Sequence, residues 1–184
     1  MAEREPAPSG GAVAAVTAAS AAGLVAMAAR FSPEMTGAED IAGRADGLRS
    51  ELGRLADDDA RSYAAVLEAY RRERDAQRPA AIRQALEGAA DVPLAIAEHA
   101  REVGELGVGV LREGNRNLRG DAGTAVLLAH GAARSAVLLV RLNVLLGDLG
   151  PRRAEQAATA CEALGSSVAA VSDELLKVSG GGLP

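Results

Sequence analysis

The chain of 184 residues is 48% hydrophobic and 24% charged, the balance of one soluble globular domain. Its net charge of -5 and its aromatic content of 2% argue against nucleic-acid binding, which needs a basic surface and rings that stack on bases. The single cysteine, Cys161, excludes an internal disulfide and fits a reducing compartment, so we expect a cytoplasmic protein.

The chain starts with Pro6-Ala7-Pro8-Ser9-Gly10-Gly11 and continues into an almost uncharged helix over about residues 12–29. Ser9 is a suitable N-cap, and Gly10 and Gly11 leave the free N–H groups of the first turn open. Such a helix start can bind a phosphate or carboxylate, although an ordinary cap explains the same residues.

This first helix is long enough to cross a membrane. Its Ala, Gly, Ser and Thr content gives little drive for insertion, and Glu3 and Glu5 do not fit the positive segment of a signal peptide. We therefore expect no membrane contact and place this helix at the centre of the fold, because a helix that is apolar all round in a soluble chain is a buried one.

A second helix is predicted from about residue 38 to 72, with one apolar seam at spacings of three and four residues. The same spacing of three and four residues places Asp59 on the apolar seam, whereas Asp57 and Asp58 face solvent. A buried carboxylate costs free energy unless it has a partner. Asp59 is therefore a site residue, half of an interhelical salt bridge, or the point where the seam leaves the bundle, with Tyr63 beside it one turn later.

Pro79 suits the first turn of a third helix, which we expect Pro93 to bend or divide. His99 lies off the apolar seam of this helix, near Glu98 and Glu102, and is interpreted as a surface histidine. Two histidines and one cysteine without ligand spacing predict no metal site.

A polar loop containing Asn117 leads to Asp121, the predicted N-cap or first-turn acid of a fourth helix over about residues 122–146. Asn143 lies among apolar residues of that helix and needs hydrogen-bond partners if it is buried. Asp121 and Asn143 are 22 residues apart, about 33 Å along a straight helix. Either they serve different sites, or one is structural, or a second subunit closes the gap.

A fifth helix is predicted over about residues 152–177, with Cys161 as a small buried residue that has no basic neighbour to lower its pKa. We detect no strand pattern and no nucleotide-type glycine loop. The prediction is an all-α multihelical bundle around a buried first helix. It forms a single domain over residues 6–178, with flexible ends at 1–5 and 179–184.

Five motifs occur in order between Pro6 and about Leu176. They are Pro6-Ala7-Pro8-Ser9-Gly10-Gly11, Asp59 with Tyr63, Ala89-Ala90-Asp91-Val92-Pro93-Leu94, Gly114-Asn115-Arg116-Asn117 with Gly120-Asp121, and Leu139-Val140-Arg141-Leu142-Asn143. Together they resemble the cyclodeaminase/cyclohydrolase family of folate one-carbon enzymes.

The resemblance implies an interlocked homodimer that releases ammonia from 5-formiminotetrahydrofolate, giving 5,10-methenyltetrahydrofolate, or that hydrolyses the methenyl form. Neither reaction needs a metal or a redox cofactor, so a tetrahydrofolate derivative is the only small molecule expected. Both need an acid/base group, for which we predict Asp59 first and Asp121 second. The predicted substrate-binding residues are Ser9, Gly10, Gly11, Tyr63, Asn117 and Asn143.

The chain departs from the family pattern at Gly120, where the family has Ser, and at Leu139, where it has Asn. Ser9 displaces the third glycine of the start, and the lysine-containing stretches after the first two helices are missing. Lost polar groups favour an alternative function. The protein would then be a diverged homologue with an altered ligand or lost catalysis, acting as a binding or structural helical dimer.

Overall fold

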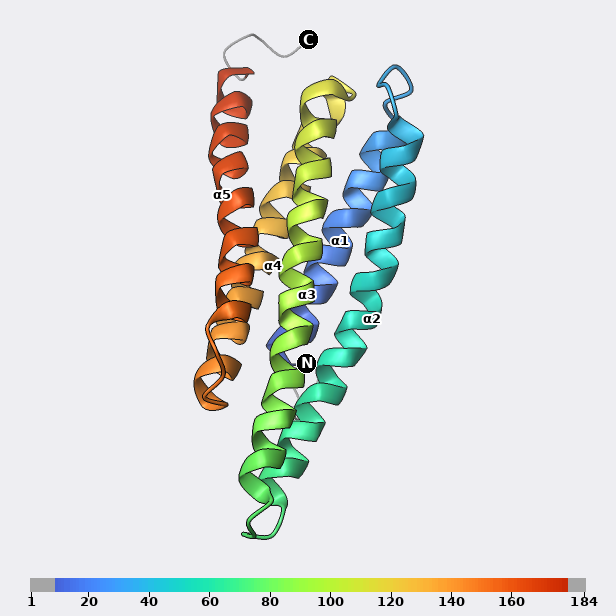
Figure 1. Cartoon of the computed structure of the whole chain (residues 1–184). Coiled ribbons are helices and arrows are strands. Elements are labelled where there is room, and N and C mark those ends of the chain that lie inside the picture. Colours follow the sequence, from blue (N-terminus) through green and yellow to red (C-terminus); the bar gives the residue numbers. More distant parts are fainter. Residues whose placement is uncertain (1–8, 179–184) are drawn as a thin grey trace.

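The computed structural model describes residues 9–178, which form an all-α fold without strands in that range (Figure 1). The elements are α1 (Gly10–Arg30), α2 (Ala38–Arg71), α3 (Arg78–Glu113), the 3₁₀ turn η1 (Arg116–Leu118), α4 (Arg119–Leu146) and α5 (Arg152–Val178). The predicted fold class is confirmed. Residues 1–8 and 179–184, with the two N-terminal prolines and both predicted flexible ends, lie outside the described residues.

Helix α1 packs against α2, α3 and α4, while α5 packs against α3 and α4 (Figure 1). The hairpin of α2 and α3 is the longest part of the bundle and extends past the start of α1 (Figure 1). This arrangement gives α1 the central place that its apolar sequence predicted, because three helices cover it.

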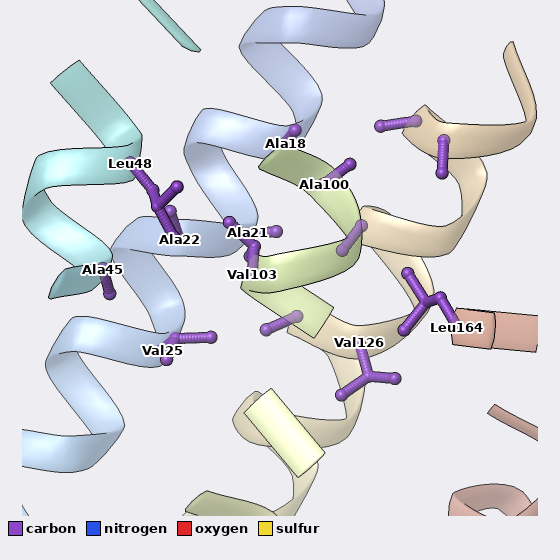
Figure 2. Packing of buried hydrophobic residues seen from close by; sticks show 14 of the residues in the cluster. Ala18, Ala21, Ala22, Val25, Ala45, Leu48, Ala100, Val103, Val126 and Leu164 are labelled. Atoms are coloured by element: carbon purple, nitrogen blue, oxygen red, sulfur yellow. The ribbon is translucent and has the colours of Figure 1, made fainter. Parts of the chain in front are cut away.

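Small residues let the helices approach closely. Ala18, Ala21 and Ala22 of α1 are fully buried, and Leu48 of α2 points toward Ala22 (Figure 2). At Gly104 of α3, an added Cβ would lie 2.3 Å from a Leu164 methyl of α5. The core of the described residues therefore consists of alanine, glycine and aliphatic side chains, without an aromatic ring.

One face of the two most apolar helices remains uncovered. By length and composition alone, α1 and the stretch over residues 116–146 could each cross a membrane, but buried core helices pass the same test. On this face, which we call the open strip, the exposed and half-buried residues of α1 and α4 recur every three or four positions and carry no charge. It comprises Val13, Val16, Thr17 and Ser20 of α1 and Leu128, Gly131, Ser135, Leu138, Leu142 and Leu145 of α4.

Two helix boundaries differ from the predictions. Helix α3 runs without a break through Pro93, so of the two outcomes expected there the division is wrong, and the bend stays a prediction. Helix α4 begins three residues before the predicted start, with Leu118 at the N-cap, so Asp121 is a first-turn acid and not the cap. The turn η1 leads directly into α4 and takes the place of a side-chain cap.

Candidate active site

Asp59 of α2 is buried, with 8% of its surface exposed, as its place on the apolar seam predicted. Its Oδ2 atom accepts a hydrogen bond from the Ala12 backbone N–H at 3.0 Å and another from the Ser9 hydroxyl. The partner of Asp59 is thus the start of α1, where free N–H groups and the positive end of the helix dipole favour a carboxylate.

The two glycines at the start of α1 have different environments. A Cβ added to Gly11 would lie 2.0 Å from Oδ1 of Asp59, a distance at which atoms overlap. A Cβ added to Gly10 would meet nothing within 4 Å. Gly11 therefore allows Asp59 to reach α1, whereas Gly10 leaves the helix end open to solvent.

Ser9 occupies the N-cap position that was predicted for it, but its side chain makes no cap bond to the backbone. Its hydroxyl donates to Asp59, and Asp59 caps Ala12 in its place. The anion that the helix start was expected to attract is therefore already present as a side chain of α2. Binding of a ligand carboxylate at Gly10 and Gly11 stays a prediction, and it must now tolerate this neighbouring charge.

A groove of about 420 Å³ opens beside this helix start, between α1 and α4. Its walls are small or apolar, and they overlap the open strip. Leu139, which replaces the family's Asn, lines it together with Gly10. The lining residues are Gly10, Val13, Ala14, Thr17, Gly131, Ala132, Ser135, Leu138 and Leu139.

Tyr63 lies one turn after Asp59 on α2 and is 40% exposed. No hydrogen bond joins its hydroxyl to any residue between 9 and 178. Its ring is available to a ligand that approaches the start of α1 from the α2 side, and its predicted role in substrate binding stays untested.

The opposite end of α1 is tied to the loop before α4. The Asn115 amide donates to the Phe31 carbonyl at 3.0 Å, and its oxygen accepts from the Asn117 N–H at 3.0 Å. The Asn115 N–H donates to Ser32 Oγ at 2.8 Å. Sequence analysis named Asn115 only as part of a motif and gave the site role to Asn117 of the same motif, whose side chain is exposed.

Asp59 and Asp121 do not meet within one chain. A Cβ at Gly107 would contact Val25 at 3.4 Å and the Ala122 carbonyl at 3.7 Å, so the start of α4 lies beside Val25. Gly11, which touches Asp59, is about 21 Å from Val25 along α1. The partly exposed Asp121 therefore lies near the other end of α1.

Asn143 has a structural partner. Its amide N–H donates to the Ala89 carbonyl of α3 at 2.7 Å. That carbonyl has no helical partner because residue 93, four positions later, is a proline without an N–H. Asn143 thus supplies the donor that Pro93 cannot give to the Ala89 carbonyl. Its predicted contact with substrate stays untested.

The remaining titratable residues give no metal site among residues 9–178. His99 Nε2 lies 2.9 Å from the Glu51 carboxylate on the surface of α2 and α3. Burial raises the pKa of the Cys161 thiol, although Arg134 and Arg141 oppose the rise. The prediction that Cys161 has no basic neighbour was therefore wrong, but burial has the larger effect on its pKa.

Comparison with known proteins agrees with this architecture. The family described as formiminotransferase-cyclodeaminase matches residues 1–171 of the chain. A methenyltetrahydrofolate cyclohydrolase from Methylorubrum extorquens is 36% identical over 155 residues, which cover 78% of this chain and 74% of that protein. A formiminotetrahydrofolate cyclodeaminase from Thermotoga maritima has a similar structure, with a TM-score of 0.78, 25% identity, and coverage of 96% of this chain and 89% of its own. The chain therefore belongs to the formiminotransferase-cyclodeaminase family.

Proposed function

We propose that this protein is an enzyme of folate one-carbon metabolism that acts on a C–N bond of a tetrahydrofolate derivative. The substrate class comes from its relatives, which are named a methenyltetrahydrofolate cyclohydrolase and a formiminotetrahydrofolate cyclodeaminase. The observation that carries the proposal is the buried Asp59 carboxylate at the start of α1. The groove that Gly10 lines opens at the same helix start, although Asp59 itself is not part of its lining.

The two oxygens of Asp59 differ in their partners. Oδ2 accepts from the Ser9 hydroxyl and the Ala12 N–H, while Oδ1 has no donor among residues 9–178. A carboxylate held in this way can take a proton from an attacking amine or water, as ring closure with loss of ammonia and hydrolysis of the methenyl form each require. We assign Asp59 as the general base and Ser9 as the residue that orients it.

The alternative function is a diverged homologue that binds another ligand or has lost catalysis. Its support is the groove wall, where Leu139 supplies an apolar side chain in place of the family's Asn. Gly120 likewise lacks the family's Ser, although a Cβ at this position would meet nothing within 4 Å. The space for the lost hydroxyl is therefore still present.

The test compares two carboxylates that are two residues apart. Purified protein is mixed with 5,10-methenyltetrahydrofolate or its formimino precursor, and turnover is followed by absorbance. We expect Asp59→Asn to lower turnover by about 100-fold or more, because it removes the base but keeps an oxygen for the Ala12 N–H. The matched control Asp57→Asn, at an exposed position, should retain wild-type turnover.

Absence of turnover above buffer, together with absence of folate binding by calorimetry, would reject the folate enzyme and favour the diverged homologue. Equal turnover by the Asp59→Asn and wild-type proteins would reject Asp59 as the base while keeping the enzyme.

We also propose that the protein is a homodimer that buries the open strip. An uncharged apolar strip is rare on the surface of a soluble monomer. In the open strip, Leu138 and Leu145 are 67% and 78% exposed. A second copy supplies an equally uncharged, small-residue surface, as a two-fold interface requires. A two-fold axis perpendicular to α1 and α4 would bring the Asp121 end of one strip against the Asp59 end of the other.

Sedimentation tests the dimer. Leu138→Glu puts a charge in the middle of the strip and should give monomers. Phe31→Glu, which changes a residue 63% exposed outside the strip, should leave the dimer intact. A monomeric wild-type protein would contradict the proposal.

Mixing tests whether each site uses both chains. Asp59→Asn and Asp121→Asn homodimers should each have low activity. After exchange, each mixed dimer holds one intact site made of Asp59 from one chain and Asp121 from the other, so about a quarter of wild-type activity should return on statistical mixing. Failure of activity to return, with exchange verified, would place Asp121 outside the site.

A further inference from the structure

A second hollow, distant from Asp59, lies where the α2–α3 hairpin meets the end of α4. Its volume is about 610 Å³, and its walls include Arg74, Arg78 and Arg83 together with the apolar side chains of Ile82 and Leu146. Tyr70, at the end of α2, also lines it and is 42% exposed. Along α2, Tyr70 is about 16 Å from Asp59, so this hollow is separate from the proposed active site.

The hairpin has the opposite charge to the chain as a whole. Residues 71–83 contain five arginines and two acids, a net charge of +3 within a chain of net charge -5. The charge is concentrated at one end of the bundle, where α2 and α3 extend past the start of α1 (Figure 1). The basic hairpin therefore attracts anions even though the protein is acidic overall.

Several arginines elsewhere on the protein, although not all of them, have close carboxylate partners. Arg44 pairs with Glu102 and Arg153 with Asp91, each at 2.5 Å. In the hollow, by contrast, Arg83 is 3.7 Å from the Glu87 carboxylate.

The other two arginines of the hollow have no carboxylate partner among residues 9–178. Arg78 donates to the Tyr70 carbonyl at 2.7 Å, and its buried Nε atom has no acceptor. Asp75, which could neutralise them, uses Oδ1 to accept the N–H groups of Gln77 and Arg78. Asp148 at the rim is the other acid in the lining, which leaves a net positive charge.

We propose that this hollow binds a small, multiply charged anion that carries phosphate or carboxylate groups. Planar guanidinium groups bind both kinds of oxyanion through paired N–H donors, and three of them converge on one cavity here. The hydrogen bond from the Arg78 side chain to the Tyr70 carbonyl holds this guanidinium in place before the anion binds. Ile82 and Leu146 provide an apolar wall for the uncharged part of the ligand.

Tyrosine fluorescence gives a local readout, because the chain has no tryptophan and two tyrosines. In a Tyr63→Phe background, Tyr70 is the only emitter, and it lines the hollow. This protein is titrated with pyrophosphate and, separately, with citrate at constant ionic strength. We expect a saturable change in fluorescence with at least one of them.

Two variants locate the site. Arg74→Gln combined with Arg83→Gln should weaken binding at least tenfold, while both positions, being exposed, leave the fold intact by thermal unfolding. The matched control Arg54→Gln, exposed on α2 about 25 Å before the end of that helix at Arg71, should not change the affinity. Saturation by pyrophosphate alone identifies a phosphate ligand, and saturation by citrate alone a carboxylate ligand. A linear response to both anions, or equal affinity in the double variant, would overturn the proposal.

Discussion

Two polar side chains on packed helix faces, Asp59 and Asn143, each form a hydrogen bond with a backbone group of another helix that lacks a helical partner. Asp59 of α2 accepts the Ala12 N–H at the start of α1, and Asn143 of α4 donates to the Ala89 carbonyl in the middle of α3. Sequence analysis predicted both as site residues. The structure separates them, because an unpaired backbone group explains the presence of Asn143 fully and that of Asp59 only in part.

Asn143 supplies a hydrogen-bond donor that the Ala89 carbonyl lacks within α3. Pro93 removes the N–H that would bind the Ala89 carbonyl, and only a donor from outside α3 can replace it. The Ala12 N–H does not require a carboxylate, because a neutral side chain can cap the start of a helix equally well. Ser9 already occupies the N-cap position. A buried charge exceeds what α1 requires, which favours a chemical role for Asp59 and a structural one for Asn143.

The largest expected effect on stability is at Gly11. Gly11→Ala would place a Cβ 2.0 Å from Oδ1 of Asp59, and neither the helix backbone nor the buried carboxylate can move without losing hydrogen bonds. We expect a loss of about 2–4 kcal/mol in the free energy of unfolding, measured by urea denaturation.

Gly10→Ala is the matched control, because a Cβ at that position meets nothing within 4 Å. Alanine is the better helix former by about 0.8–1.0 kcal/mol in a helix interior and by less in the first turn, so stability should stay the same or rise. A Gly11→Ala protein as stable as the Gly10→Ala protein would show that Asp59 does not depend on close contact with α1.

The next effect is at Asn143. Asn143→Leu keeps the size of the side chain but leaves the Ala89 carbonyl without a donor in a partly buried place. We expect a loss of about 1–3 kcal/mol in the free energy of unfolding.

A double-mutant cycle isolates the cause of that loss. Pro93→Ala restores an N–H four residues after Ala89, so in this background Asn143→Leu should cost less than about 0.5 kcal/mol. The same cost in both backgrounds would mean that Asn143 acts through something other than the gap in α3, and it would return this residue to the list of substrate contacts.

Local patterns predicted most of the helices, because alternating apolar residues and Gly/Pro breaks act over a few positions. They also predicted that Asp59 points inward. They could not predict its partners, since the hydrogen bonds to Ser9 and Ala12 join residues 50 and 47 positions apart and depend on how α1 and α2 align.

The same limit applies to Asn143. Its need for a partner was visible in the sequence, and so was the defect that Pro93 causes, but their meeting depends on the packing of α4 on α3. The start of α4 was missed for a local reason. The turn η1 brings the chain into the helix without a side-chain cap, so the helix begins before Asp121, which is the first-turn acid that the prediction gave as an alternative to the N-cap.

The smallest expected effect is at an exposed contact between α2 and α3, where Arg44 makes two hydrogen bonds to Glu102. Arg44 lowers the pKa of Glu102 below its ordinary value of 4.5, so the unfolded chain binds the proton more tightly than the folded one. The pair therefore stabilises the fold above pH 4.5, and this contribution is lost as the pH falls through the lowered pKa. Because the pair is exposed and screened, Glu102→Gln should cost less than about 1 kcal/mol at neutral pH, and the two proteins should converge in stability in acid. Urea denaturation across this pH range measures the difference in the free energy of unfolding. If Glu102→Gln cost as much at neutral pH as Asn143→Leu, solvent exposure would not explain why surface contacts contribute less than buried ones.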